Sequence, residues 1–137
     1  MKPYEFFDHT ADIGVRIHGR TREELFTNAA CAFYDVQGRF ELADQRVLKI
    51  ELAADSFAEL LVRWLSELVF RLSAEGAVFK YCRLQFPNDR TLVAEIEGGA
   101  VNFERSEVFE EIKAVTYHQL SMQETPEGWM AIVIFDV

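Results

Sequence analysis

Cysteine and proline are scarce in this chain, whose 137 residues include two Cys and three Pro. Cys31 and Cys82 lie far apart in apolar segments, without the paired spacing of a zinc site or of a disulfide-rich scaffold. We therefore expect two buried free thiols in a reducing compartment, the cytoplasm. No run of 18 apolar residues occurs, and Glu5 and Asp8 interrupt the first residues before the apolar core of a signal peptide could develop. The sequence thus predicts neither a membrane span nor a secretory signal.

Basic residues are also few, with 14 Lys and Arg against 23 Asp and Glu and a formal net charge of −9. Nucleic-acid binding depends largely on contacts of Lys and Arg with phosphates, so this balance disfavours strong direct binding of RNA or DNA. The sequence also shows no phosphate-binding Gly-rich loop, Ser/His/Asp arrangement or nucleophilic Cys environment. An acidic surface suits cation binding or docking onto a basic protein.

Apolar residues make up half of the chain and fall into clear periodic patterns. Residues 21–38 and 55–76 have helical spacing, with Thr21 and either Asp55 or Ser56 as N-caps and Gly at each C-terminal end. Alternation predicts strands at residues 12–20, 47–54, 77–86, 91–99, 110–122 and 129–137. The pair Gly98–Gly99 is interpreted as a turn that ends its strand, and the last strand, apolar on both faces, is expected at the centre of a sheet. These patterns predict a single α+β domain over residues 1–137, with a mixed or antiparallel sheet and two helices packed against it.

Acidic residues mark the ends of two predicted strands. Asp12 begins the first, and Asp136 is followed only by Val137. If the two strands are antiparallel neighbours, Asp12 meets Asp136 and the Val137 carboxylate at one rim, where Gly14 would leave room for a ligand. Carboxylates and backbone carbonyls are the hard oxygen ligands that Ca²⁺ and Mg²⁺ prefer. The alternative is that these Asp residues serve turns or caps, and that His9 is a structural, hydrogen-bonded histidine.

Four segments, "FDHTADIGVRIHG", "LLVRWLSEL", "EIKAVTYH" and "IVIFDV", follow one another along the chain, which resembles the archease family. The resemblance implies a small cytoplasmic accessory protein of the RNA-splicing ligase that joins tRNA exon halves. Such a protein assists guanylylation and repeated turnover of the ligase, is not itself an enzyme, and binds a divalent cation, Ca²⁺ first and Mg²⁺ or Mn²⁺ as alternatives.

The family motifs also imply roles for individual residues. The metal-site positions of the family fall on Asp12, Asp136 and Val137, while Asp8 and His9 match the motif as further ligands or as supporting residues. Lys113, in the "KAVTYH" block, is a candidate contact for the nucleotide or for the guanylylated centre of the partner. Gln119 departs from the family pattern, where a small residue is expected after "TYH".

Two functions of other classes stand beside the ligase cofactor. The chain could be a stand-alone metal-dependent phosphohydrolase that uses Asp8, His9, Asp12 and Asp136. It could instead be a general chaperone-like partner of RNA-modifying enzymes. Hydrolysis by the purified protein would favour the first, and recovery of many partners rather than chiefly the ligase would favour the second.

Overall fold

The computed structural model describes residues 2–9 and 11–137, and the side chain of His9 lies outside this description. Within these residues the chain forms nine strands and two helices. In chain order they are β1 (Tyr4–His9), β2 (Asp12–Gly19), α1 (Arg22–Gln37), β3 (Gly38–Arg39), β4 (Arg46–Ala53), α2 (Phe57–Glu75), β5 (Ala77–Asn88), β6 (Thr91–Ala100), β7 (Glu107–Val108), β8 (Ala114–Thr125) and β9 (Gly128–Asp136). No helix of this described part is long and apolar enough to cross a membrane.

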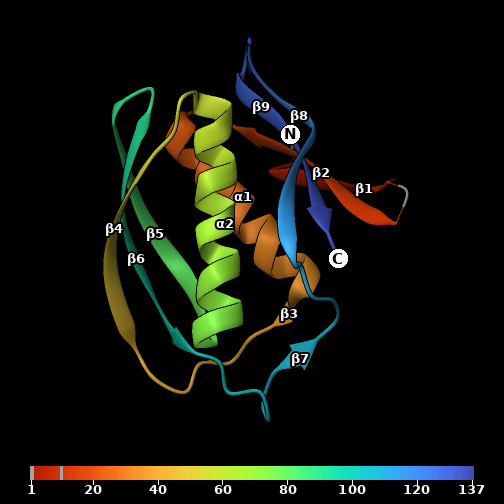
Figure 1. Ribbon diagram of the computed structural model, residues 1–137, viewed down its shortest axis with the longest axis vertical. Coiled ribbons are helices and arrows are strands. Elements are labelled where there is room, and N and C mark those ends of the chain that lie inside the picture. Colours follow the sequence, from red (N-terminus) through yellow and green to blue (C-terminus); the bar gives the residue numbers. More distant parts are fainter. Residues whose placement is uncertain (1, 10) are drawn as a thin grey trace.

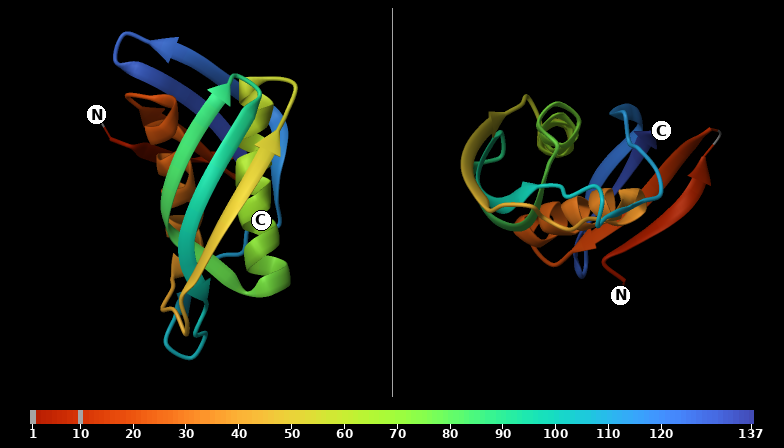
Figure 2. Two further views of the ribbon diagram at one scale, coloured as in Figure 1. Left: turned by 90° about the vertical axis from the view of Figure 1, so that its left-hand side faces the viewer. Right: turned by 90° about the horizontal axis from the view of Figure 1, so that it is seen from below.

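The strands form two main sheets with the helices between them. One sheet has the order β1-β2-β9-β8, the other has the order β4-β6-β5, and β3 and β7 form a separate pair. Every ladder is antiparallel. Helix α1 packs on β2 and β5, and α2 packs on β8, β5 and β4 (Figures 1 and 2). The predicted α+β class with antiparallel sheets and two helices is confirmed, and β9 is an inner strand as expected.

Both helices begin and end where their local sequence dictates. The Thr21 hydroxyl accepts a hydrogen bond from the Glu24 amide at 3.1 Å, and Ser56 does the same for the Glu59 amide. The Glu59 side chain in turn accepts from the Asp55 amide at 3.2 Å, so Ser56 rather than Asp55 is the cap of α2. Gly76 ends α2 in the left-handed conformation, at φ 62°.

One cluster of buried side chains joins both sheets to both helices. From α2 it takes Leu60, Leu61, Trp64, Leu65 and Leu68, which follow the predicted helical stripe and are all buried. The Trp64 indole N–H donates to the backbone oxygen of Phe26 at 3.0 Å, which satisfies the one polar atom of this large side chain and ties α2 to α1. The helices are thereby fixed to each other between the sheets.

The pair Gly98–Gly99 does not form the expected turn. Both residues lie inside β6, which continues to Ala100. A Cβ atom on Gly98 would clash with the backbone oxygen of Val78 on β5, and one on Gly99 would clash with the backbone oxygen of Asp44. The two glycines are therefore needed for close backbone approach on both sides of the strand.

Strand β1 was also missing from the expected elements. It pairs with β2 at the edge of the four-stranded sheet, with Tyr4 opposite Ile17 and His9 opposite Asp12. Its apolar residues Phe6 and Phe7 are adjacent, so they show no alternation for a sequence pattern to detect.

Candidate functional site

Asp12 and Asp136 stand opposite each other at one end of the four-stranded sheet. The β2–β9 register pairs their Cα atoms directly, as predicted for antiparallel neighbours. Side chains of directly opposed residues point to the same face of a sheet, with Cα atoms about 4.5–5.5 Å apart. Val137 follows at once, and its side chain packs against the core cluster. We call Asp12, Asp136 and Val137 the carboxylate rim.

The backbone of the rim is held from both sides. Asp136 pairs with Asp12 on β2 and with Ala114 on β8. The Lys113 amide also donates to the backbone oxygen of Asp136 at 2.8 Å. The Asp136 and Lys113 side chains are exposed, so the carboxylate and the ammonium group extend from a fixed backbone into solvent. The strand predicted at residues 110–122 in fact begins at Ala114, so Lys113 lies immediately before β8 and not within it.

The other predicted residues lie nearby on β1. Asp8 is exposed and pairs with Ile13, one residue from Asp12, while only the backbone of His9 is described. Gly14 does not leave open space as expected, because the Phe7 ring lies where its Cβ would be. The Arg16 guanidinium lies over that same ring at 5.9 Å. An aromatic ring and a cation therefore cover the sheet face beside the rim.

The donor atoms of the rim suit a hard divalent cation. Asp12 and Asp136 supply two carboxylates, and the Val137 carboxylate would be the third if the chain ends there. Among the described side chains, which exclude that of His9, no group of three or more His, Cys, Asp or Glu is placed to hold a metal ion. The predicted set needs only two such side chains, since its remaining donors are the terminal carboxylate and backbone oxygens. An all-oxygen set of this kind favours Ca²⁺ or Mg²⁺ over zinc.

A buried amide that the sequence reasoning missed supports this end of the sheet. Gln37, the last residue of α1, is 2% exposed. Its Nε2 donates to the Phe33 oxygen at 2.9 Å, its Oε1 accepts from the Ile112 amide at 3.0 Å, and its backbone oxygen accepts from Phe109. The segment that leads to Lys113 is thus attached to α1. The only signal in the sequence is a polar residue four positions after Phe33 on an apolar helix face.

Comparison with known proteins gives the family. The model of the Archease protein family (MTH1598/TM1083) matches residues 4–137. The chain belongs to the archease family. It is 36% identical to Protein archease of Methanosarcina barkeri, covering 99% of this chain and 97% of that protein, and 34% identical to Protein archease of Thermococcus gammatolerans over the whole of both chains.

Solved structures agree with this assignment. The solution structure of protein 1598 of Methanobacterium thermoautotrophicum has 31% identity and a TM-score of 0.75, with 100% of both chains covered. An archease of Thermotoga maritima, described as a possible chaperone, matches with a TM-score of 0.71 at 20% identity, covering 96% of this chain and 94% of that one. The latter likeness supports the fold.

Gln119, where the resemblance leads us to expect a small residue, lies in an irregular part of β8. Thr116 pairs with Ile134 and Ser121 with Ile132, so the four intervening residues of β8 bulge opposite a single residue of β9. Within this bulge Gln119 has φ 55°, a left-handed conformation that glycine adopts without steric cost. Glycine is therefore favoured at this position, and Gln119 is strained there.

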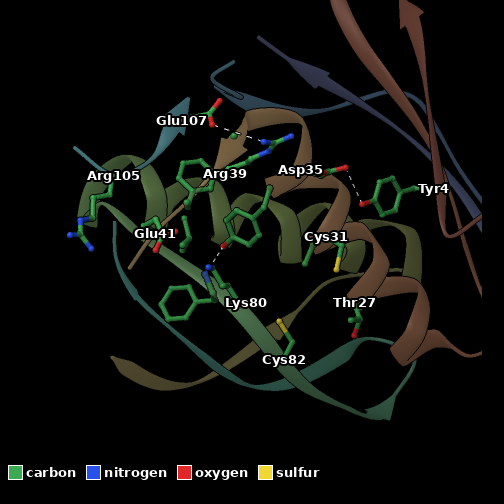
Figure 3. Close-up of a pocket in the computed structure, with 16 residues that line it drawn as sticks. Tyr4, Thr27, Cys31, Asp35, Arg39, Glu41, Lys80, Cys82, Arg105 and Glu107 are labelled. Atoms are coloured by element: carbon green, nitrogen blue, oxygen red, sulfur yellow. Dashed lines mark hydrogen bonds and ion pairs between the residues drawn. The ribbon is translucent and has the colours of Figure 1, made fainter. Parts of the chain in front are cut away.

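The two thiols face a cavity of about 550 Å³ between α1, β3 and β5 (Figure 3). None of the described rim residues lines it, nor does Lys113. Cys31 is exposed rather than buried, which corrects the expectation, and Cys82 is half-buried; both are free. Burial, and secondarily Cys31, raises the pKa of Cys82 to about 12, and burial also raises the pKa of Cys31. Both thiols are therefore protonated at neutral pH and are poor nucleophiles and metal ligands.

Proposed function

We propose that this chain is a non-catalytic accessory protein of an RNA-splicing ligase. It promotes guanylylation and repeated turnover of the ligase, and the carboxylate rim holds a divalent cation, Ca²⁺ in the first place. Membership of the archease family over residues 4–137 supports this role. The observation that carries it is the register that sets Asp12 opposite Asp136, with the Lys113 amide bound to Asp136.

The arrangement suits action on the active site of another protein. The rim lies at the end of a sheet with an exposed Asp136 carboxylate and an exposed Lys113 ammonium, so a partner can reach both without opening the fold. Asp12 and Asp136 would hold the cation, and a bound cation would offer a positive centre to phosphate oxygens. Lys113 can bind a phosphate or a carboxylate of the partner as a flexible point charge.

A guanylylation time course tests the proposal. The ligase of the same organism is incubated with GTP, with and without this chain, under single-turnover and multiple-turnover conditions. The unsubstituted chain and the control Glu51→Ala, an exposed carboxylate on β4, should both raise the rate and the number of turnovers, whereas Asp12→Ala should not. Equal rates with and without the chain would refute the accessory role.

A general chaperone-like role is the second candidate, because the structurally similar Thermotoga maritima protein is described as a possible chaperone. A chaperone would raise the yield of active ligase during folding and would leave the activity of fully folded ligase unchanged. The proposed cofactor instead accelerates folded ligase, and Asp12→Ala removes that effect. The third alternative, a stand-alone phosphohydrolase, requires phosphate release by the purified chain without ligase.

A further inference from the structure

A second hollow lies at the C-terminal end of α2, between that helix and the segment that connects β6 to β8. It encloses about 270 Å³, and its apolar lining consists of Phe40, Val69, Leu72, Phe103, Val108 and Ile112. We call this hollow the apolar groove. Figure 1 shows the connecting segment, which includes β7, passing the lower end of α2 on its way to the start of β8.

Two large apolar side chains of the groove are open to solvent. Phe103 is 58% exposed and Val108 is 57% exposed. A single exposed apolar residue is ordinary, but neighbouring ones around a hollow are typical of a surface that another molecule covers. Both residues line the hollow and belong to one segment of the chain.

Hydrogen bonds hold the walls of the groove in place. Phe103 belongs to a turn in which the Ser106 hydroxyl donates to the Asn102 oxygen at 2.7 Å, and the Asn102 amide donates to the Glu41 oxygen at 2.7 Å. On the other wall, Gln37 accepts the amide of Ile112. A groove that is already formed costs a ligand little ordering of the protein on binding.

The charge around the groove is negative. Glu110 and Glu111 line it, and residues 103–112 contain four Glu and one Arg. The last turn of α2 has no basic residue, and the C-terminal end of a helix carries the negative end of its macrodipole. A complementary ligand therefore combines an apolar side chain with flanking Lys or Arg.

The lining of the groove leads along the chain to the carboxylate rim. Ile112 lines the groove, and the next residue, Lys113, donates its amide to Asp136. A protein segment seated in the groove therefore places the rest of its molecule beside the rim.

We propose that the apolar groove docks a basic amphipathic segment of the partner protein, with a large apolar side chain between Phe103 and Ile112 and Lys or Arg beside Glu110 and Glu111. The identity of the partner as the ligase rests on the proposed function. Docking in the groove would contribute to the affinity for the ligase, and the cation at the rim would contribute to its activation. Substitutions can therefore remove either effect alone.

The affinity of the ligase for the full chain tests the docking site by calorimetry. Phe103→Ser with Val108→Ser should weaken binding about 10-fold or more, as loss of central apolar contacts does, and Glu110→Lys with Glu111→Lys should do the same. The matched controls Tyr81→Ser and Glu95→Lys with Glu97→Lys alter exposed residues of the other sheet and should bind as the unsubstituted chain does. Circular dichroism confirms that each variant is folded. At saturating concentration the groove variants should still activate the ligase, whereas Asp12→Ala should bind normally without activating.

Photocrosslinking identifies the bound segment directly. With p-benzoylphenylalanine in place of Phe103, the crosslinked ligase peptide should contain a large apolar residue flanked by Lys or Arg. Unchanged affinity of both groove variants, a crosslink to an acidic segment, or a crosslink to a second copy of this chain would overturn the docking proposal alone. Failure of the unsubstituted chain to bind the ligase would refute the proposed function together with this inference.

Discussion

Replacing Gln37 with Leu tests whether one buried amide holds the segment that reaches both proposed surfaces. The substitution removes two hydrogen bonds: the one that the Ile112 amide donates to Gln37 and the one that Gln37 donates to the Phe33 oxygen. Ile112 is only 3% exposed, so water cannot easily replace the lost acceptor. An unpaired buried N–H costs about 1–3 kcal/mol and a lost amide hydrogen bond about 1 kcal/mol. The gain from burying Leu offsets about 1 kcal/mol of this. We expect a net loss of about 2 kcal/mol, equivalent to roughly 8 °C in the melting temperature of a chain of this size.

Urea unfolding and amide hydrogen exchange on the same preparation measure the two consequences. Gln37→Leu should lower the free energy of unfolding and speed exchange at Ile112 and Lys113, whose amides bond to Gln37 and Asp136. The control Gln85→Leu changes an exposed amide on β5 and should leave both unchanged. A loss below about 0.5 kcal/mol, with unaltered exchange at Ile112, would show that Gln37 does not hold this segment.

Four further predictions concern the rim and the thiols. Asp12→Ala should abolish the heat of Ca²⁺ and Mg²⁺ binding in calorimetric titration without unfolding the core, and undiminished affinity would remove Asp12 from the site. If the chain ends at Val137 and its carboxylate is a ligand, residues added after Val137 should impair ligase activation while circular dichroism stays unchanged, because the extension converts that carboxylate into a peptide bond; full activity of the extended chain would contradict this. Lys113→Ala should lower guanylylation severalfold and change stability by less than about 0.5 kcal/mol, as exposed substitutions do, whereas a large loss in thermal melts would make Lys113 structural. Because the pKa of Cys82 is raised from 9.0 to about 12, the unfolded thiol ionises first, so stability should fall as pH rises from 9 toward 12; this fall should be smaller in Cys82→Ala, and identical pH profiles would contradict the assignment.

Helices and the longer alternating strands were predictable because their signals are local. Thr21, Ser56 and Gly76 mark helix ends through bonds to residues three or four positions away. Alternation similarly identified β4, β5, β6 and β9. Edge strand β1 has neighbouring aromatic residues instead of alternation, and the two-residue strands β3 and β7 are too short for any period.

The site was predictable where it follows from strand ends and unpredictable where it depends on distant contacts. Asp12 and Asp136 flank apolar strands, so antiparallel pairing was enough to bring them together. The hydrogen bond between Gln37 and Ile112 joins residues 75 positions apart, and no pattern in the sequence around either residue predicts it. Gly98 was interpreted as a turn for the same reason, because the backbone of Val78 that requires it comes from another strand.

Asp136 differs from an ordinary acidic residue at a strand end, because a second acidic residue, Asp12, stands directly opposite it. Its backbone is fixed between β2 and β8, which keeps its Cα atom directly opposite that of Asp12. If the two carboxylates point to the same face at a separation of about 5 Å, they repel by about 1 kcal/mol at the dielectric constant of water, and by more where solvent is partly excluded. A bound cation would attract both carboxylates and so offset their repulsion. At a concentration of about 100 times its Kd, a cation stabilises the fold by about 2.7 kcal/mol. Ca²⁺ should therefore raise the melting temperature of the unsubstituted chain above its value in EDTA, while Asp12→Ala should show no such rise. An equal rise of the melting temperature with Ca²⁺ in both chains would show that Asp12 is not a ligand of the cation.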